Sequence, residues 1–199
     1  IIIPVFNEEE SIPFLLDNIE IHIQNGNEII IIDDGSTDNS TKILKKNKNI
    51  NLIQIKDNKG KGYAIKRGLE RAKNEKIIIF DGDLEIHTDE IKKLMILDKN
   101  NNIFSTMGYR FKKLFPLKSF FDLGNFLFTT FYNLLFKANH KDILCCAKSF
   151  YKDLIKVSEL KSDSFDIDVE LAYFLSKIES PNNPLQIYIQ YKRRNINEG

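Results

Sequence analysis

The chain has 199 residues, of which 42% are hydrophobic and 29% are charged, and its formal net charge is +1. This length suits one domain with a sizeable core, and the balanced composition excludes wholesale disorder. A net charge this close to zero gives no global electrostatic reason to bind nucleic acid, so we expect no nucleic-acid partner.

The cysteines and the two ends of the chain bear on its setting. Cys145 and Cys146 are adjacent and would make a poor disulfide pair, which favours a reducing, cytoplasmic environment. The chain opens on the apolar run IIIP with no basic segment before it, and it stops at Gly199 without a helix or strand terminator. We therefore expect a single domain that is clipped at both ends.

Short apolar, β-branched runs alternate with amphipathic stretches in the first half of the chain. This pattern predicts strands over residues 1–4, 28–32, 51–55 and 76–80, and helices over residues 8–24, 38–46, 60–73 and 88–97. Such alternation is typical of βαβ units, so we predict an α/β fold with a parallel sheet. Open parallel sheets bind ligands at the carboxyl ends of their strands, and the loops there are the first place to look for a site.

The loop after the first predicted strand reads PVFNEEE. Taken alone it is a strand end followed by a helix start, in which Pro4 ends the ladder, Asn7 caps and the glutamates complement the helix dipole. The dinucleotide fingerprint G-x-G-x-x-G is absent here, and the later GKG run lacks its third glycine because Ile65 stands there. Both patterns disfavour a nicotinamide-dependent dehydrogenase.

The second predicted strand ends in the run DDGSTD. A tight turn and a helix cap account for its later residues. They do not account for Asp33 and Asp34, two like charges at the end of a buried strand, which repel each other and lose solvation. Such a pair indicates a bound group that needs acceptors, such as a base N–H, a ribose hydroxyl or a cation.

The fourth predicted strand runs into FDGDLE, which places Asp81 and Asp83 on either side of Gly82. Neither acid is needed as a helix cap, because Thr88 can cap the next helix. The glycine lets the backbone bend so that both carboxylates face one point, and such oxygen ligands suit Mg²⁺ or Mn²⁺ carrying a diphosphate. Glu85 can supply a third oxygen.

Gly60, Lys61 and Gly62 open the third predicted helix. They form either a flexible turn before the helix or an anion site, where backbone N–H groups and the helix dipole meet a phosphate. Both interpretations stay open.

Residues 117–136, LKSFFDLGNFLFTTFYNLLF, are predicted to form a helix that is apolar around nearly its whole circumference. At about 20 residues the segment is marginally long enough to span a bilayer. Four polar residues recur at helical spacing: Asn125, Thr129, Thr130 and Asn133. They favour a helix that lies in the membrane interface, with an ordinary core helix as the alternative.

The chain resembles the nucleotide-sugar-binding half of glycosyltransferase family 2 in four stretches of matching order and spacing: IIIPVFNEEESI, IIIIDDGSTDNS, NKGKGYAIKRGLERAK and IIFDGDLEIHTDEI. Later stretches, among them DILCCAKSFYKD, FDIDVELAYFLSK and IYIQYKRRNINEG, resemble the dolichol-phosphate mannosyltransferase-like branch. The resemblance implies a three-layer nucleotide-diphospho-sugar transferase fold of the glycosyltransferase A type, with a mostly parallel central sheet and helices on both faces. Residues 1–108 would then bind the nucleotide sugar, and residues 109–199 would face the acceptor and the membrane.

The resemblance also implies roles for the strand-end residues. Pro4, Phe6 and Glu8 match the stretch that holds the base and ribose, and Asp33 or Asp34 matches the acid that pairs with the base. The family usually has Tyr where Phe6 stands.

Asp81, Asp83 and Glu85 match the metal and diphosphate ligands, although the family often has Gln at the last of these positions. The nucleotide-sugar-binding set implied by the resemblance is completed by Gly60, Lys61, Gly62 and Gly82.

The resemblance implies inverting, metal-dependent transfer of a sugar from GDP-mannose or a UDP-sugar to a polyprenyl or dolichyl phosphate at the cytoplasmic face of a membrane. A phosphate acceptor is already anionic near neutral pH, so the protein needs positive charge to hold it. Arg110, Arg193 and Arg194 are the candidates, because arginine binds phosphate through two hydrogen bonds.

Two alternatives stay open. A family 2 enzyme that transfers to a sugar hydroxyl in cell-wall or surface polysaccharide needs a general base, and Asp142, before a predicted strand over residues 143–147, is the candidate. A non-catalytic membrane-surface module that binds nucleotide sugars is the other alternative. The oligomeric state stays open.

Overall fold

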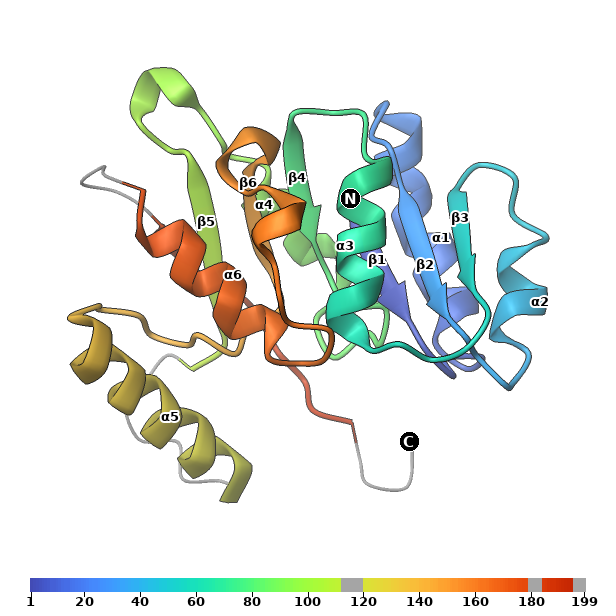
Figure 1. The fold of residues 1–199 in the computed structure, drawn as a ribbon. Helices are drawn as coiled ribbons and strands as arrows, with labels where there is room; N and C mark the ends of the chain where they lie inside the picture. Colours follow the sequence, from blue (N-terminus) through green and yellow to red (C-terminus); the bar gives the residue numbers. More distant parts are fainter. Residues whose placement is uncertain (112–119, 179–183, 195–199) are drawn as a thin grey trace.

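The computed structural model describes residues 1–111, 120–178 and 184–194 (Figure 1). Seven strands in this part of the chain form one sheet in the order β3-β2-β1-β4-β6-β5-β7. Their bounds are β1 (Ile2–Val5), β2 (Ile30–Asp34), β3 (Asn51–Ile55), β4 (Lys76–Ile79), β5 (Ser105–Tyr109), β6 (Lys148–Tyr151) and β7 (Leu185–Tyr188). Four of the six neighbouring pairs are parallel, and β6 runs antiparallel to β4 and β5. The mostly parallel sheet is therefore confirmed.

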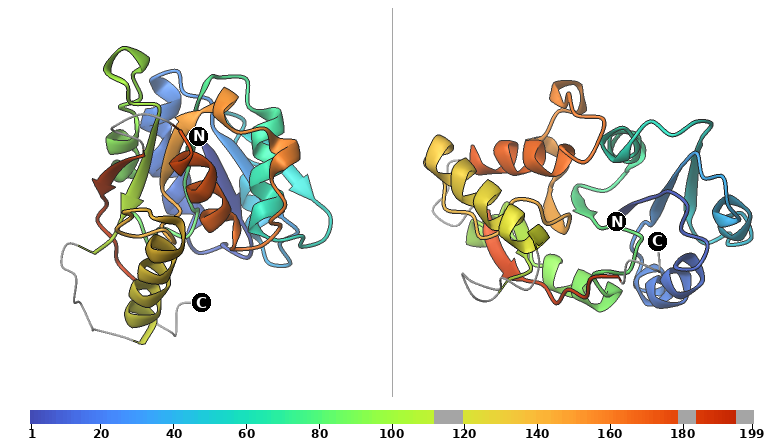
Figure 2. Two further views of the ribbon diagram at one scale, coloured as in Figure 1. Left: turned by 60° about the vertical axis from the view of Figure 1, so that its left-hand side comes forward. Right: turned by 90° about the horizontal axis from the view of Figure 1, so that it is seen from below.

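Helices cover both faces of the sheet and give three layers (Figures 1 and 2). The α-helices are α1 (Ile12–Gln24), α2 (Ser40–Leu44), α3 (Lys61–Arg71), α4 (Ile91–Leu94), α5 (Phe120–Phe136) and α6 (Ile167–Ser176). Short 3₁₀ turns are η1 (Thr88–Glu90), η2 (Lys99–Asn101), η3 (Lys152–Leu154) and η4 (Val157–Glu159). Helices α1, α2 and α4 lie on one face of the sheet, and α3 and α6 lie on the other.

Side-chain alternation along the strands divides the core between the two faces. Ile30 and Ile32 of β2 pack in the core that includes α3 and α6, whereas Ile29 and Ile31 pack with α1 and α2. A strand that is buried on both faces reads as a continuous apolar run, which is why the sequence predicts this strand well.

The first helix begins later than predicted, at Ile12 instead of residue 8. Asn7 has a positive φ of 54°, and its side-chain oxygen accepts a hydrogen bond from the backbone N–H of Thr37 at 2.8 Å. Asn7 therefore joins two loops at the carboxyl ends of β1 and β2 instead of capping a helix.

Two other predicted elements differ from the structure. The helix predicted over residues 88–97 is a 3₁₀ turn followed by α4, and His87 provides the cap in place of Thr88. The strand predicted over residues 143–147 is wrong, since this run is a loop and β6 begins at Lys148. Apolar composition predicts that such a run is buried, but it does not distinguish a buried loop from a buried strand.

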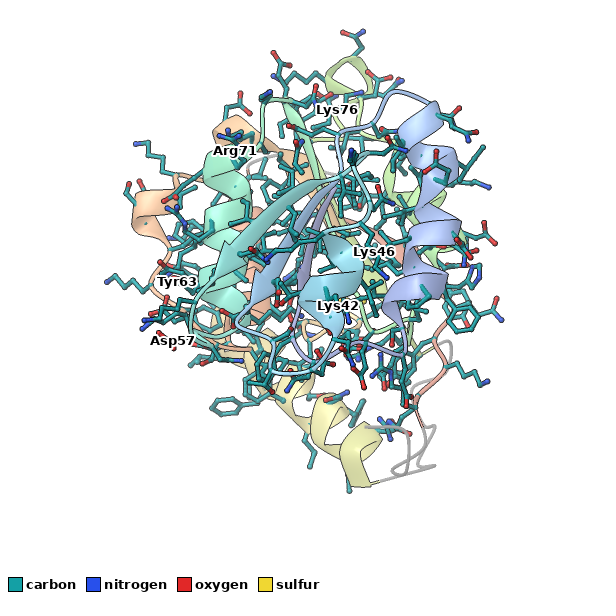
Figure 3. The ribbon with its side chains drawn as sticks, turned by 90° about the vertical axis from the view of Figure 1, so that its right-hand side faces the viewer. Lys42, Lys46, Asp57, Tyr63, Arg71 and Lys76 are labelled. Carbon is teal, nitrogen blue, oxygen red and sulfur yellow. The ribbon has the colours of Figure 1, made fainter. Side chains whose placement is uncertain are left out.

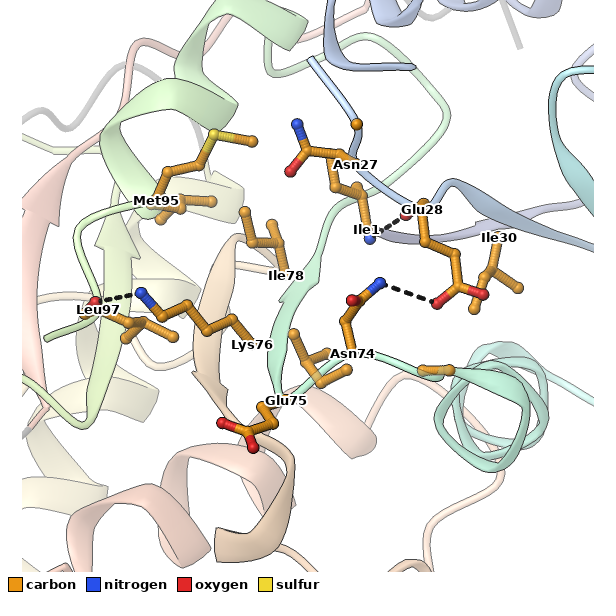
Figure 4. A pocket seen from close by; sticks show the side chains of 14 residues that line it. Ile1, Asn27, Glu28, Ile30, Asn74, Glu75, Lys76, Ile78, Met95 and Leu97 are labelled. Atoms are coloured by element: carbon orange, nitrogen blue, oxygen red, sulfur yellow. Dashed lines mark hydrogen bonds between the residues drawn. The ribbon is translucent and has the colours of Figure 1, made fainter. Parts of the chain in front are cut away.

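The carboxyl ends of β1 to β4 lie along one edge of the sheet. Figure 3 shows Asp57 and Tyr63, which follow β3, near this edge and Lys76, which begins β4, at the opposite edge. A cavity of ≈ 540 Å³ lies at that opposite edge (Figure 4). Two of its charged groups are bonded to the main chain, because Lys76 donates to Leu97 O at 2.8 Å and Glu28 accepts from the N–H of Lys73 at 3.0 Å.

Helix α5 lies below the body of the sheet in Figure 1, on the side of the carboxyl ends. The predicted residues 117–119 lie outside the described residues. None of the helices in the described ranges combines the length and apolar composition that crossing a bilayer requires. Large apolar side chains on one side of α5 are nevertheless exposed, and we call this set the apolar face of α5: Leu127, Phe128, Phe131, Leu134 and Leu135.

Polar residues anchor the other side of α5 to the protein. Buried Thr129 accepts a hydrogen bond from the N–H of Ile143 at 3.4 Å. The Asn133 amide donates to His140 O at 2.8 Å and accepts from His140 N at 2.9 Å. The alternative of an ordinary core helix is therefore wrong for α5, because the five residues of its apolar face are exposed. Of its other positions, Tyr132 is buried in the core, and Thr130 is exposed and donates to Phe126 O of its own helix at 2.8 Å.

Candidate active site

A pocket of ≈ 370 Å³ opens among the loops that follow β1, β2 and β4. Strand β2 lies on one side of β1 and β4 lies on the other, so the strand order reverses at this place. Open α/β sheets bind ligands at such topological switch points. The pocket is lined by Pro4, Val5, Phe6, Glu8, Asp34, Asn58, Gly60, Lys61, Asp81, Gly82, Asp83 and Phe165. Of the residues predicted to bind a nucleotide sugar, Asp33 and Gly62 are not among those that line it.

Asp81 and Asp83 line this pocket on either side of Gly82. A Cβ added at Gly82 would lie 2.5 Å from Cγ1 of Val5, so a glycine is needed for this loop to pack against β1. The residue of this loop with a positive φ is Leu84, at 60°. The glycine therefore provides room for close packing, and the predicted bend at this residue is not what brings the two acids into the pocket.

The two oxygens of Asp81 have different surroundings. Oδ2 accepts a hydrogen bond from Lys61 Nζ at 2.9 Å, whereas Oδ1 is buried and has no hydrogen-bond partner in the described structure. Burial, together with the neighbouring charge of Asp81, raises the pKa of Asp83 to about 7. Both observations indicate a place that lacks positive charge, and a divalent cation fits these oxygen donors.

Glu85 does not complete a cluster of three carboxylates. Its Oε1 accepts a hydrogen bond from the backbone N–H of Arg194 at 3.1 Å, and its carbonyl accepts one from Lys192 N at 2.8 Å. Across the described ranges, no three His, Cys, Asp or Glu side chains are arranged to hold a metal ion. The expectation of a third ligand is therefore not met among the described residues, and the segment that follows β7 engages one carboxylate oxygen of Glu85.

Asp34 and Asp33 are both buried, and both accept hydrogen bonds from the protein. Asp34 accepts from the backbone N–H groups of Lys59 and Gly60 at 3.0 and 2.7 Å, and burial raises its pKa. Asp33 accepts from the N–H of Ser36 at 3.0 Å and from a hydroxyl of α2. Only Asp34 of this pair is among the residues that line the described pocket, so it is the one placed to meet a ligand.

The start of α3 is held by close backbone packing. Gly60 has a φ of 97°, and its N–H is already bonded to Asp34. The N–H of Tyr63 donates to the Asp163 carbonyl at 3.1 Å, and a Cβ at Gly62 would meet the loop before α6. These glycines therefore serve packing and loop geometry, and an anion site at this helix start stays a prediction.

The loop after β1 brings Phe6 and Glu8 to the pocket, and Phe6 is 41% exposed. Glu8 pairs with Arg194, whose guanidinium also donates to the Asp83 carbonyl at 2.8 Å and to Ser11 Oγ at 2.6 Å. Arg194 thus ties the loops after β1 and β4 together.

The other two predicted phosphate-binding arginines also pair with carboxylates. Arg110 donates through Nε and Nη2 to both oxygens of Asp142 at 2.7 and 3.0 Å. Burial opposes the charge of Arg110, but Asp142 outweighs that effect and raises its pKa. Arg193 donates to Asp122 of α5 at 2.8 Å. The lining residues of the described pocket include none of these arginines.

Sequence reasoning missed two features of the site. Lys61 donates to Asp168 at 2.8 Å as well as to Asp81, and Asp168 also pairs with Lys148 at 3.4 Å. A charged residue on the apolar side of α6 is a signal that would have found Asp168. Phe165 lines the pocket with 77% of its surface exposed, and no sequence signal distinguishes it from other aromatic residues.

Comparisons with known proteins identify the family and the fold. The model of the family described as glycosyl transferase family 2 matches residues 1–156. The chain is 37% identical over 103 residues to the undecaprenyl-phosphate 4-deoxy-4-formamido-L-arabinose transferase of Proteus mirabilis, a match that covers 48% of this chain and 32% of the relative. It is 29% identical over 207 residues to the dolichyl-phosphate beta-glucosyltransferase of Dictyostelium discoideum, covering 91% of this chain and 63% of the relative.

The fold is that of a solved enzyme. Glucosyl-3-phosphoglycerate synthase from Mycobacterium tuberculosis, in complex with Mn²⁺, UDP-glucose and glycerol 3-phosphate, superposes with a TM-score of 0.73 at 16% identity. The match covers 99% of this chain and 73% of that structure. Together with the three layers, this similarity places the chain in the glycosyltransferase A fold class.

Proposed function

The chain belongs to glycosyltransferase family 2, and from that premise we propose that it transfers a sugar from a nucleotide-diphospho-sugar to a polyprenyl phosphate at a membrane surface, with a divalent cation. The names of the two curated relatives, an undecaprenyl-phosphate and a dolichyl-phosphate transferase, support this acceptor class. The donor is GDP-mannose or a UDP-sugar.

The observation that carries the proposal is the charge deficit at Asp81 and Asp83. Two acids share a pocket, one with an unpartnered buried oxygen and the other with a pKa raised to about 7. A structural role satisfies its buried polar atoms internally, whereas a ligand site leaves them for the ligand. Asp81 and Asp83 would therefore hold Mg²⁺ or Mn²⁺, which when bound neutralises negative charge on the departing nucleoside diphosphate.

The residues around these acids would hold the rest of the donor. Phe6 and Asp34 lie in the same pocket and are placed for the base and ribose, in line with the roles that the family resemblance implies. Lys61 at the start of α3 brings a positive charge beside Asp81, where the diphosphate would lie.

The acceptor side favours a phosphate over a hydroxyl. A hydroxyl acceptor needs a general base, but both oxygens of Asp142 are bonded to Arg110 and its side chain is 1% exposed. A phosphate monoester, whose second ionisation lies near pH 6, is already a nucleophile and needs no general base. Attack on the face opposite the diphosphate would invert the anomeric centre.

The apolar face of α5 supports action at a membrane. Its exposed side chains include Leu134 at 80% and Phe131 at 63%, and such surface is costly to leave in water. Asp122 on the same helix pairs with Arg193, which lies next to Arg194 and so connects α5 to the pocket loops. An enzyme on the cytoplasmic face of a membrane would reach a polyprenyl phosphate in this way.

A binding titration followed by a transfer assay tests the proposal. Thermal shift with UDP-glucose and with GDP-mannose, each with and without Mn²⁺, should raise the melting temperature of the chain only when the metal is present. Transfer to a polyprenyl phosphate should then follow with the stabilising donor. Asp81→Asn should keep the fold and lose the metal-dependent shift, and an undiminished shift in this variant would contradict the assignment.

A further inference from the structure

We propose that Asp168 is a positioning residue of the donor site, which acts on Asp81 through Lys61. Asp168 holds the Lys61 ammonium on Oδ2 of Asp81, so that Oδ1 of Asp81 stays available to a divalent cation. This inference rests on the proposed metal site, and it concerns residues of α6 and β6 that lie outside the pocket lining.

Asp81, Lys61, Asp168 and Lys148 form a network of ion pairs in which the charges alternate. Asp81 Oδ2 lies 2.9 Å from Lys61 Nζ, and the same nitrogen lies 2.8 Å from Asp168 Oδ2. The other oxygen of Asp168 lies 3.4 Å from Lys148 Nζ, which also donates to the Cys145 carbonyl. Each of these ion pairs therefore uses only one oxygen of its carboxylate. The second oxygen of Asp168 meets Lys148, and the second oxygen of Asp81 has no partner in the described structure.

Three members of this network are almost fully enclosed. The side-chain exposed fractions are 9% for Lys61, 6% for Asp168 and 0% for Lys148. Burying charges costs several kcal/mol per ion after relaxation, and replacing such networks by apolar residues is often neutral or stabilising. Stability alone is therefore a weak reason for these four charged residues to be here. We infer that they serve Asp81, the member of the network that lines the pocket.

Lys61 without Asp168 would not leave one oxygen of the Asp81 carboxylate unbonded. An ammonium without another acceptor can sit between both oxygens of one carboxylate, because it has three donors. Asp168 takes one of those donors from the opposite side and draws Lys61 toward α6. The result is the observed arrangement, in which Oδ2 of Asp81 is bonded and Oδ1 is not.

Binding of Mn²⁺ alone to the full chain tests this role, measured from the loss of the free-ion signal in electron paramagnetic resonance. Asp168→Asn should weaken Mn²⁺ binding about 10- to 100-fold, the range for residues that orient metal ligands. Asp168→Asn combined with Lys148→Met removes one charge of each sign, so it keeps the interior balanced and should fold. The same loss is expected in this double variant.

The matched control is Asp163→Asn. Asp163 also pairs with a lysine of α3, Lys66 at 2.6 Å, but its side chain is 60% exposed and it has no link to Asp81. This control should bind Mn²⁺ as the parent does.

A double-mutant cycle separates positioning from a structural role. Lys61→Met removes the ammonium that competes for the oxygens of Asp81, so it should strengthen Mn²⁺ binding. Adding Asp168→Asn to it should then cause no loss if Asp168 acts only through Lys61. Parent-like Mn²⁺ affinity in the charge-balanced variant, or full additivity in the cycle, would overturn the inference and leave the proposed function in place. A parent chain that binds no Mn²⁺ would instead overturn the metal site itself, and this inference with it.

Discussion

Replacing Phe131, Leu134 and Leu135 together by serine removes the most exposed side chains of the apolar face of α5. Their exposed fractions are 63%, 80% and 61%. Moving a fully exposed side chain of this kind out of water gives about 1.5–3 kcal/mol, so each of these contributes about 1–2 kcal/mol on entering a membrane interface. Losing all three should cost about 3–6 kcal/mol, which is at least about a 100-fold fall in partitioning.

The assay is sedimentation of the full chain with phospholipid vesicles at rising lipid concentration. The parent should sediment with the vesicles, and the triple variant should stay in the supernatant. The fold should be kept, because the polar side of α5 makes the contacts to the protein through Thr129 and Asn133.

The matched control is Phe14→Ser on α1, since Phe14 is 65% exposed but belongs to another helix. It should leave vesicle binding unchanged. The reasoning is refuted if the triple variant sediments with vesicles as strongly as the parent, or if Phe14→Ser weakens binding equally, because exposed apolar area anywhere would then suffice.

Two further predictions concern single residues. Burial lowers the pKa of His140 from 6.5 to about 4, so its neutral form is favoured by folding; this stability is fully present above pH 6.5 and is lost as the pH falls toward 4. It amounts to about 3 kcal/mol, and denaturant unfolding at pH 7 and pH 4.5 should differ less in His140→Gln than in the parent. Phe165→Ala should raise the KM for the donor about 3- to 10-fold and leave the KM for the acceptor unchanged, because its exposed ring lies at the donor pocket. An unchanged donor KM would remove Phe165 from the site.

Strands β1, β2 and β4 in the first half of the chain are predictable because they are mostly buried on both faces. Runs such as residues 29–32 are apolar throughout, and each is followed by polar or glycine residues that a strand does not need. Parallel strands bring those loops to one edge, so Phe6, Asp34 and Asp81 could be assigned to one pocket without coordinates.

The second half is less predictable because its strands bury polar groups. In β5 and β6 the hydroxyls of Thr106 and Ser149 are hydrogen-bonded to each other at 2.8 Å and fully buried. β6 begins with Lys148, a residue type that normally marks the surface. Neither strand has the apolar run that indicates a strand, and the run that does precede β6 is a loop.

The same limit applies to the charges of the site. A local motif indicates where a carboxylate lies, but whether that carboxylate is free depends on partners that are distant in sequence. Lys61 and Asp168 are 107 residues apart, and Glu8 and Arg194 are 186 apart. Such pairs explain why Glu85 and the three arginines, which look available in the sequence, are bonded in the structure, whereas Asp81 keeps one oxygen without a partner among the described residues. Because burying an unpartnered carboxylate oxygen is costly, this one atom distinguishes a ligand site from a structural ion pair more sharply than the D-x-D spacing does.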